Sequence, residues 1–274
     1  MRTPATDLTI PPMPVALSIA GSDPTGGAGL QADLQVFRAM GVHGAGVLTA
    51  LTVQDSRTVR QVLPVFPSVV LEQLRVLLRD LVPQAVKIGM LGSDDVVRNV
   101  LLGLAPLDAS VPIVLDPVLH ASDGTRLLER RAYPGLRALM ARCCLVTPNL
   151  PEAETLAECD VSTHAGTERA ARMLVDELGA GAALVKGGHR DGEPHDLLAL
   201  RDPAGTRLVW LEHPRIEGGP AHGTGCALSS AITSSIALGR PLEDAVSEGR
   251  RFVQEALRRA RVRGGGGARF LVYP

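Results

Sequence analysis

A short turn rich in glycine, His222-Gly223-Thr224-Gly225-Cys226, precedes a stretch of small residues that predicts a helix. Backbone N–H groups at the start of a helix bind anions such as phosphate. A cysteine in that place would have its thiolate stabilised by the helix dipole, which lowers the thiol pKa toward neutrality. One turn could therefore hold a transferring phosphate beside a general base. The alternative is a buried structural cysteine in a helix of small residues.

A second glycine-rich segment, residues 21–29 (GSDPTGGAG), follows an apolar run and precedes a helical pattern. Its glycines allow the backbone to approach a ligand closely. The match of residues 27–32 to the dinucleotide fingerprint GxGxxG/A is weak, and the sequence has no Gly-Lys-Ser/Thr of a Walker motif. A tight connection between a strand and a helix is the alternative.

Further polar side chains stand where expected strands end or helices begin. Asn149 and Glu152, three residues apart, could hold hydrated Mg²⁺ and phosphate oxygens. The same spacing is also typical of a capping box at a helix start. Lys186 could direct a cation toward a ligand or could be a solvated lysine before a glycine turn. Asp116 could orient a metal ion or water, or form a turn.

The elements that must position these residues alternate along the chain. Short apolar runs predict strands at residues 15–20, 46–53, 85–88, 112–116, 145–147 and 182–186. Residues 196–201 and 207–211, separated by Asp-Pro-Ala-Gly-Thr, predict a hairpin at a sheet edge. Helical periodicity lies between the strands, which predicts an α/β protein with three layers, α/β/α, around a mostly parallel sheet. Ligands bind such sheets at the carboxyl ends of the strands, so we expect these loops to meet there.

The composition limits the classes of protein to consider. The chain has 274 residues, 45% of them hydrophobic and 3% aromatic, and a net charge of −1. Such a chain buries a sizeable core, and it lacks the basic excess of proteins that bind nucleic acids or anionic membranes. Four cysteines without CxxC spacing favour a reducing compartment, so we expect a cytoplasmic protein. We expect one domain over residues 14–262, a flexible segment over residues 1–13 and a flexible glycine-rich tail over residues 263–274.

The order of the loops resembles that of the hydroxymethylpyrimidine and phosphomethylpyrimidine kinases of thiamine biosynthesis, in the ribokinase superfamily. The matching stretches are AGSDPTGGAGLQADL (20–34), TALTVQDSR (49–57), KIGML (87–91), VLDPV (114–118), TPNLPEAE (147–154), LVKGGH (184–189) and HGTGCALSSAI (222–232). They span the chain from about residue 14 to about residue 260. Sugar kinases of the superfamily usually carry Asp where this chain has Cys226.

The resemblance implies an ATP- and Mg²⁺-dependent kinase, expected to be a homodimer, with a role for each matching residue. Cys226 would be the base that activates a hydroxymethyl group, and Gly223, Thr224 and Gly225 would surround the γ-phosphate. Lys186 would steady the nucleotide phosphates together with Thr224 and Asn149. The substrate pocket would consist of Gly21, Asp23, Ala28, Gln54, Met90 and Val118. The groups that govern Mg²⁺ and its waters would be Asp116, Asn149 and Glu152.

The chain departs from the family pattern beside the expected site. After residues 114–118 the family usually has M-V-A-K-S-G, whereas this chain has Leu-His-Ala-Ser-Asp-Gly. Ser122 therefore replaces a lysine, and Asp123 adds a carboxylate. Because a phosphorylated substrate needs local positive charge, we expect these changes to disfavour a second phosphorylation.

Other functions remain open on the sequence alone. A pyridoxal kinase, or an enzyme acting on both pyrimidine and pyridoxal, is the nearest alternative, because both substrates carry a hydroxymethyl group on an aromatic ring. A non-catalytic module that binds metabolites is a further alternative, although it would not require Cys226 and Lys186. A dinucleotide oxidoreductase is weaker, since the glycine match lacks an acidic residue at the end of the second strand.

Overall fold

The computed structural model describes residues 13–188, 195–212, 216, 218–219 and 221–274. The predicted segment 1–13 lies outside the described residues except for Met13, and His189 of the sixth matching stretch also lies outside them. Within the described part of the chain, no helix is both long and apolar enough to cross a bilayer.

The centre of the described fold is a sheet of eight strands in the order β10-β9-β8-β7-β6-β5-β1-β2. The bounds are Val15–Ala20 for β1, His43–Leu48 for β2, Ala85–Ile88 for β5, Ile113–Leu115 for β6, Leu145–Val146 for β7, Ala182–Val185 for β8, His195–Leu200 for β9 and Arg207–Glu212 for β10. The strands from β8 to β2 in this order pair in parallel. β9 and β10 are antiparallel at one edge, which confirms the predicted hairpin and the mostly parallel sheet.

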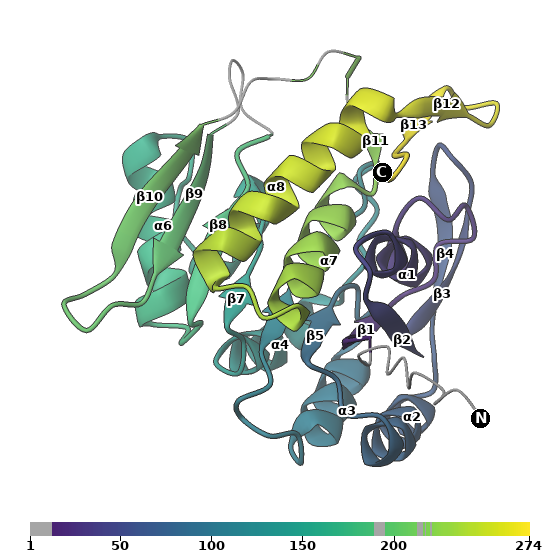
Figure 1. Ribbon diagram of the computed structural model, residues 1–274, viewed down its shortest axis with the longest axis horizontal. Helices are drawn as coiled ribbons and strands as arrows, with labels where there is room; N and C mark the ends of the chain where they lie inside the picture. Colours follow the sequence, from purple (N-terminus) through teal and green to yellow (C-terminus); the bar gives the residue numbers. More distant parts are fainter. Residues whose placement is uncertain (1–12, 189–194, 213–215, 217, 220) are drawn as a thin grey trace, which may run out of the picture.

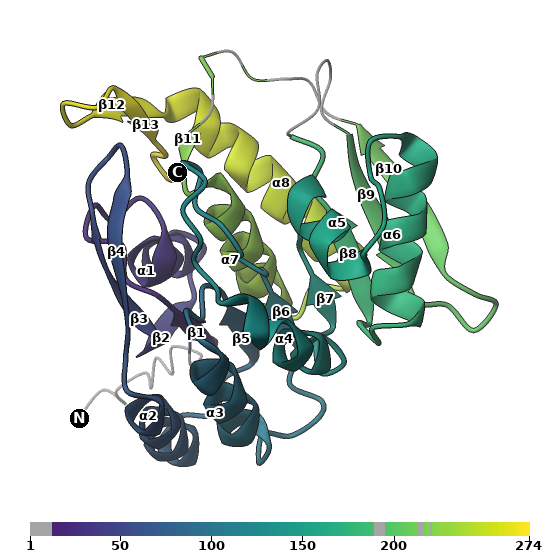
Figure 2. The same ribbon diagram turned by 180° about the vertical axis from the view of Figure 1, so that it is seen from behind.

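Helices cover both faces of this sheet, as Figures 1 and 2 show from opposite sides. One face carries α1 (Gly29–Ala39), α7 (Thr224–Ala237) and α8 (Leu242–Arg259), and the other carries α2 (Pro67–Asp80), α3 (Asp94–Leu104), α4 (Tyr133–Met140), α5 (Leu150–Ala157) and α6 (His164–Asp176). A short 3₁₀ helix, Arg130–Ala132, precedes α4. Alternate strand residues enter the two cores: Ile88 and Leu115 pack on the α2–α6 side, whereas Val114 packs on the α7–α8 side. The three-layer prediction is confirmed.

Residues 46–53 do not form the single predicted strand: residues 46–48 end β2, and the chain leaves the central sheet at Thr49. The Thr49 hydroxyl donates to the carbonyl of Met90 at 2.6 Å, and the Thr49 amide donates to the carbonyl of Ala20. The next strand, β3 (Ala50–Gln54), pairs instead with β4 (Val59–Pro64) in a separate antiparallel hairpin. This β3–β4 hairpin stands beside α1 (Figure 1).

The C-terminal segment also differs from the expected flexible tail. β12 (Arg261–Arg263) and β13 (Ala268–Phe270) form a hairpin, and β13 also pairs with β11 (Ala221–His222), directly before the glycine–cysteine turn. The glycines of residues 264–267 form the turn, since Gly264 and Gly267 have positive φ angles of 69° and 72°. Glycine here allows a tight turn between two paired strands, so the same composition does not produce a free linker.

Candidate active site

The two glycine-rich loops pack directly against each other. Gly223 caps the N-terminus of α7 with φ of 76°, and a Cβ atom there would lie 1.7 Å from the carbonyl oxygen of Gly27. No side chain fits at such a distance, so glycine at position 223 is what allows the loops to meet. The prediction that residues 21–29 and 222–226 come together at one edge is confirmed.

Lys186 and Asp116 face the first turn of α7 at Gly225. A Cβ atom on Gly225 would lie 3.2 Å from Lys186 Nζ and 3.6 Å from Asp116 Oδ2. Lys186 and the buried Asp116 form an ion pair at 2.8 Å, and the hydroxyls of Thr147 and Ser229 also donate to the Asp116 carboxylate. Burial alone would raise the pKa of Asp116, but the Lys186 and Lys87 ammonium groups outweigh it and hold that pKa below its usual range. Asp116 therefore stays ionised beside the turn.

Cys226 is half-buried in the first turn of α7, and the backbone N–H of Gly29 favours its thiolate and lowers the thiol pKa. Gly29 is the first residue of α1, so the N-termini of two helices converge on the thiol. Burial nevertheless raises the pKa of Cys226 to about 11, against the opposing effect of the Lys87 ammonium. The expectation of a thiol pKa near neutrality is therefore wrong for the protein without substrate, because loss of solvent outweighs the helix dipoles.

Asn149 and Glu152 form the capping box that their spacing allowed. The Glu152 amide donates to Asn149 Oδ1, and the Asn149 amide donates to Glu152 Oε2, both at 2.9 Å. Glu152 also accepts a hydrogen bond from the Leu119 amide. Burial raises the pKa of Glu152 to about 7, although Lys186 opposes the shift. The helix start thus holds a carboxyl group close enough to Lys186 and Asp116 to interact with both.

Apolar residues of the expected substrate pocket lie together. Met90 and Val118 belong to one small cluster that also contains Ala50 and Leu127. A Cβ atom on Gly21 would lie 2.9 Å from the sulfur of Met90, so a larger residue there would displace the methionine. Gln54 stands at the end of β3, where the pairing with β4 becomes irregular, and its side chain is half-buried.

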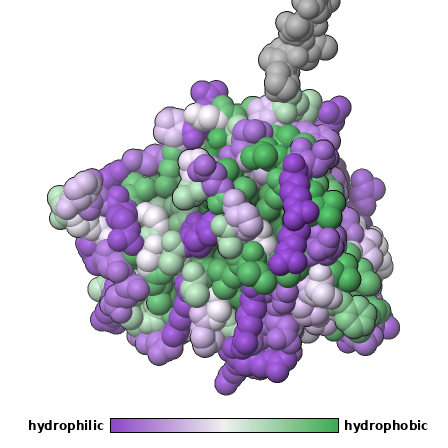
Figure 3. Space-filling view, turned by 90° about the horizontal axis from the view of Figure 1, so that it is seen from below, coloured by the Kyte–Doolittle hydropathy of each residue, from purple (hydrophilic) through white to green (hydrophobic). Residues whose placement is uncertain are grey.

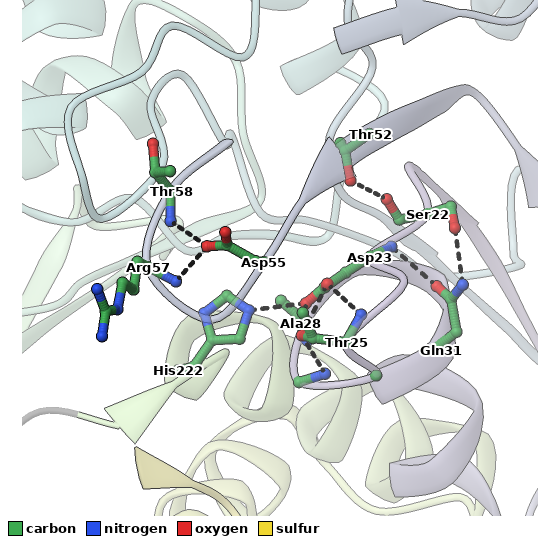
Figure 4. Close-up of polar contacts among 12 residues, drawn as sticks. Ser22, Asp23, Thr25, Ala28, Gln31, Thr52, Asp55, Arg57, Thr58 and His222 are labelled. Carbon is green, nitrogen blue, oxygen red and sulfur yellow. Dashed lines mark hydrogen bonds and ion pairs between the residues drawn. The ribbon is translucent and has the colours of Figure 1, made fainter. Parts of the chain in front are cut away.

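The Asp23 carboxylate is hydrogen-bonded by other residues of the protein (Figure 4). Its carboxylate accepts the amides of Thr25 and Ala28 at 2.8 and 2.9 Å and pairs with His222 Nε2 at 2.7 Å. Burial would raise the pKa of Asp23, but the bonds from His222 and Thr25 outweigh it and lower that pKa. Asp23 therefore joins the first glycine loop to the residue before Gly223, and a direct contact between Asp23 and substrate stays a prediction.

Asp123 is likewise held by backbone amides. Its carboxylate accepts the amides of Val59 and Thr125, both at 2.9 Å, and so ties the loop after β6 to β4. Burial opposes ionisation, but these hydrogen bonds lower the pKa of Asp123 to about 2. From the sequence, Asp123 was expected only to add a negative charge, and its structural role was missed.

Sequence analysis also missed a buried pair under the site, Lys87 and Asp33. Lys87 Nζ lies 2.7 Å from Asp33 Oδ2, and both side chains are fully buried. A lysine inside the apolar strand 85–88 was the available signal, because lysine is rarely buried without a partner.

The fold, with its two glycine-rich loops meeting beside the Lys186–Asp116 pair, is that of the ribokinase-like small-molecule kinases. The model of the family described as phosphomethylpyrimidine kinase matches residues 23–269, and the chain belongs to that family. It is therefore a phosphotransferase, which sets aside the oxidoreductase and the non-catalytic module.

The relatives agree with this assignment. A hydroxymethylpyrimidine/phosphomethylpyrimidine kinase of Streptomyces coelicolor is 39% identical over 92% of each chain. The crystal structure of a phosphomethylpyrimidine kinase from Clostridium difficile is 33% identical with a TM-score of 0.77, and the match covers 89% of this chain and 99% of that one. A Bacillus subtilis pyridoxal kinase in complex with ADP is 28% identical with a TM-score of 0.85, covering 96% and 98%.

Proposed function

We propose that the protein transfers the γ-phosphoryl group of ATP to 4-amino-5-hydroxymethyl-2-methylpyrimidine and to its monophosphate, in thiamine biosynthesis. The observation that carries the proposal is the meeting of Cys226 and the Lys186–Asp116 pair around the glycine turn, beside the apolar cluster of Met90 and Val118. Family membership supports the same substrate. Phosphoryl transfer depends mainly on positioning and charge stabilisation, which this set of groups can supply.

In the proposed reaction, the Cys226 thiolate takes the proton of the substrate hydroxymethyl group. That oxygen forms a bond to the γ-phosphorus while the bond from the γ-phosphorus to the β,γ-bridging oxygen breaks, and ADP leaves. The amides of Gly223, Thr224 and Gly225 would bind the oxygens of the transferring group, and Lys186 would offset their charge. Gln54 would recognise the aminopyrimidine, because an amide both donates and accepts hydrogen bonds.

The charged groups beside the turn also suit Mg²⁺, which we include in the proposal. Among the described residues, no set of three or more His, Cys, Asp or Glu side chains is arranged to hold a metal ion. Mg²⁺ in phosphoryl-transfer sites usually takes only one or two carboxylates and completes its shell with phosphates and water. The ionised Asp116 and the nearby Glu152 fit that pattern, with Asn149 close to the waters. The metal would neutralise charge on the phosphates.

A pyridoxal kinase activity is the second candidate, favoured by the close structural match to the pyridoxal kinase of Bacillus subtilis. The two candidates share the reaction and differ in the ring that the pocket accepts. The test is to incubate the purified protein with ATP, Mg²⁺ and, separately, the hydroxymethylpyrimidine, its monophosphate or pyridoxal, and to resolve products by mass. Phosphorylated pyrimidines that require intact Cys226 would support the proposal; phosphorylation of pyridoxal alone would overturn it.

We further propose a cytoplasmic homodimer. Apolar side chains are exposed on the β3–β4 hairpin and at the start of α2, including Leu51, Val53, Leu63 and Phe66, the last at 79% exposure. The face seen from below in Figure 3 likewise carries apolar patches among charged residues. Such patches favour association with another surface. Light scattering after gel filtration gives the mass, and a monomer at micromolar concentration would contradict the dimer.

A further inference from the structure

A cluster of four fully buried polar side chains lies between the central sheet and the helices α1 and α7. Asp33 of α1 is at its centre, and its Oδ2 accepts from Ser18 at 2.6 Å and from Lys87 Nζ at 2.7 Å. Its Oδ1 accepts from Ser230 of α7 at 2.7 Å. All four side chains are inaccessible to solvent. Ordinary packing does not require an ion pair here, because apolar residues of similar volume are often as stable or more stable.

The ammonium group of Lys87 lies on the side of the sheet that carries the catalytic turn. Lys87 is in β5, beside Ser18 of β1, and the strand ends at Ile88, directly before Gly89. A Cβ atom on Gly89 would lie 2.7 Å from Lys87 Nζ, so the glycine leaves room for the ammonium just past the end of the strand. The cluster also lies one helical turn from the thiol, because Ser230, which binds the same carboxylate as Lys87, is four residues after Cys226 in α7. The charge of Lys87 acts on both Cys226 and Asp116.

Lys87 is one of several groups that act on Cys226 from the surrounding elements. The two cations are Lys87 of β5 and Lys186 after β8. The acidic groups are Asp33 of α1, Asp116 after β6 and the Tyr273 hydroxyl of the C-terminal segment. Lys186 is paired with Asp116 and faces the glycine turn. Ser18 and Ser230 also donate to the Asp33 carboxylate, and the effect of Lys87 on the thiol exceeds the opposing effect of Asp33.

We propose that Lys87, oriented by Asp33, is a positioning residue that stabilises the thiolate of Cys226 with a fixed buried charge. Lys87 does not touch substrate in this role; it acts through the cysteine. A catalytic effect of Lys87 requires the proposed function, whereas its stabilisation of the Cys226 thiolate does not. A buried ammonium is effective because the low local dielectric strengthens its field.

The test is the alkylation rate of Cys226 by iodoacetamide in the full-length protein, located by peptide mass spectrometry. Below the thiol pKa this rate follows the thiolate fraction. Lys87→Met keeps the side chain's shape and removes its charge, and we expect about a tenfold or greater loss of rate at pH 8, which corresponds to a shift of about one pKa unit or more. Alkylation of half-buried Cys144 in the same sample should not change.

A second variant keeps the proposal testable if Lys87→Met fails to fold, because that change leaves Asp33 buried without its partner. The double variant Lys87→Met/Asp33→Asn removes both charges and keeps a neutral pair. Because Lys87 affects Cys226 more than Asp33 does, alkylation should still be slower than in the unmodified protein. Ser234→Ala is the matched control, since it removes another buried hydroxyl of α7 without removing a charge.

Kinetics then separate this role from a structural one. Both lysine variants should lower kcat with little change in the KM for ATP, and raising the pH should recover part of the lost rate. Unchanged alkylation of Cys226 in folded variants, with only a lower melting temperature, would overturn the proposal. If Cys226 is alkylated more slowly in the variants but the unmodified protein has no pyrimidine kinase activity, the charge effect is supported and the proposed function is contradicted.

Discussion

At the scale of single residues, the proposed mechanism depends on Cys226 as the general base. Cys226→Ala should lower kcat by about 10²–10⁴-fold, the usual contribution of a general base, with little change in ATP affinity. Cys226→Asp should keep part of the activity, because sugar kinases of the superfamily use a carboxylate at this position. Turnover and melting temperature of both variants provide the measurement. An alanine variant with unchanged kcat would remove the thiol from the mechanism and leave Asp116 as the candidate base.

The thiol also predicts the pH dependence of turnover. Since burial raises the pKa of Cys226 to about 11, the thiolate fraction of the free enzyme should increase with pH throughout the range from about 7 to 9. The kcat/KM for the pyrimidine should therefore rise across that range in the unmodified protein. In Cys226→Asp the rise should disappear, because a carboxylate is already ionised. An equal slope in both proteins would assign the rise to another group.

Gln54 should determine the choice of ring. Gln54→Leu removes an amide that both donates and accepts, so polar atoms of the pyrimidine lose their partner on binding. The loss of pyrimidine affinity should be about 1–3 kcal/mol, whereas ATP affinity should not change. Isothermal titration with each ligand measures both values. An equal loss for the two ligands would mean that Gln54 supports the end of β3 and does not read the ring.

At the scale of elements, the loop after β6 should limit the second phosphorylation. Ser122→Lys restores the cation of the family pattern, and it should raise kcat/KM for the monophosphate more than for the free alcohol. Ser122→Gln is the matched control, since it adds length without charge. Asp123 should remain in place in both variants, because the amides of Val59 and Thr125 hold it. An equal response of the two substrates would mean that the missing cation is irrelevant or is replaced by Arg126.

At the scale of the whole molecule, the C-terminal segment contacts elements that are far apart in sequence. The Arg57 guanidinium of the β3–β4 turn donates to the Gly265 carbonyl. The ring of Tyr273 stacks on that of Phe252 of α8, with the ring centroids 5.8 Å apart. A cavity of about 600 Å³ lies among this segment, residues 25–27 and the β3–β4 turn. Segment and hairpin are therefore coupled across one edge of the molecule.

Removal of residues 264–274 should therefore affect both stability and substrate binding. The melting temperature should fall, because the stacking on Phe252 and the pairing of β13 are lost. The KM for the pyrimidine should rise more than that for ATP, since the β3–β4 hairpin carries Gln54. Thermal unfolding measures the melting temperature, and steady-state kinetics measure the two KM values. An unchanged melting temperature and an unchanged KM for the pyrimidine would support the flexible tail expected from the sequence.

The sequence by itself determined the layered fold, the edge hairpin and the glycine loops, because each leaves a local signal. The spacing of apolar residues and the positions of glycines can be read from short stretches of the sequence. The capping box at Asn149 and Glu152 was also one of two local alternatives. These features needed no knowledge of distant contacts.

Only the tertiary structure decided how charge is arranged around the site. The raised thiol pKa of Cys226, the occupied carboxylate of Asp23 and the buried Lys87–Asp33 pair all depend on residues from separate elements. The order of the C-terminal segment likewise depends on its pairing with β11. Desolvation and ion pairing are set by distances in space, and sequence spacing does not contain those distances.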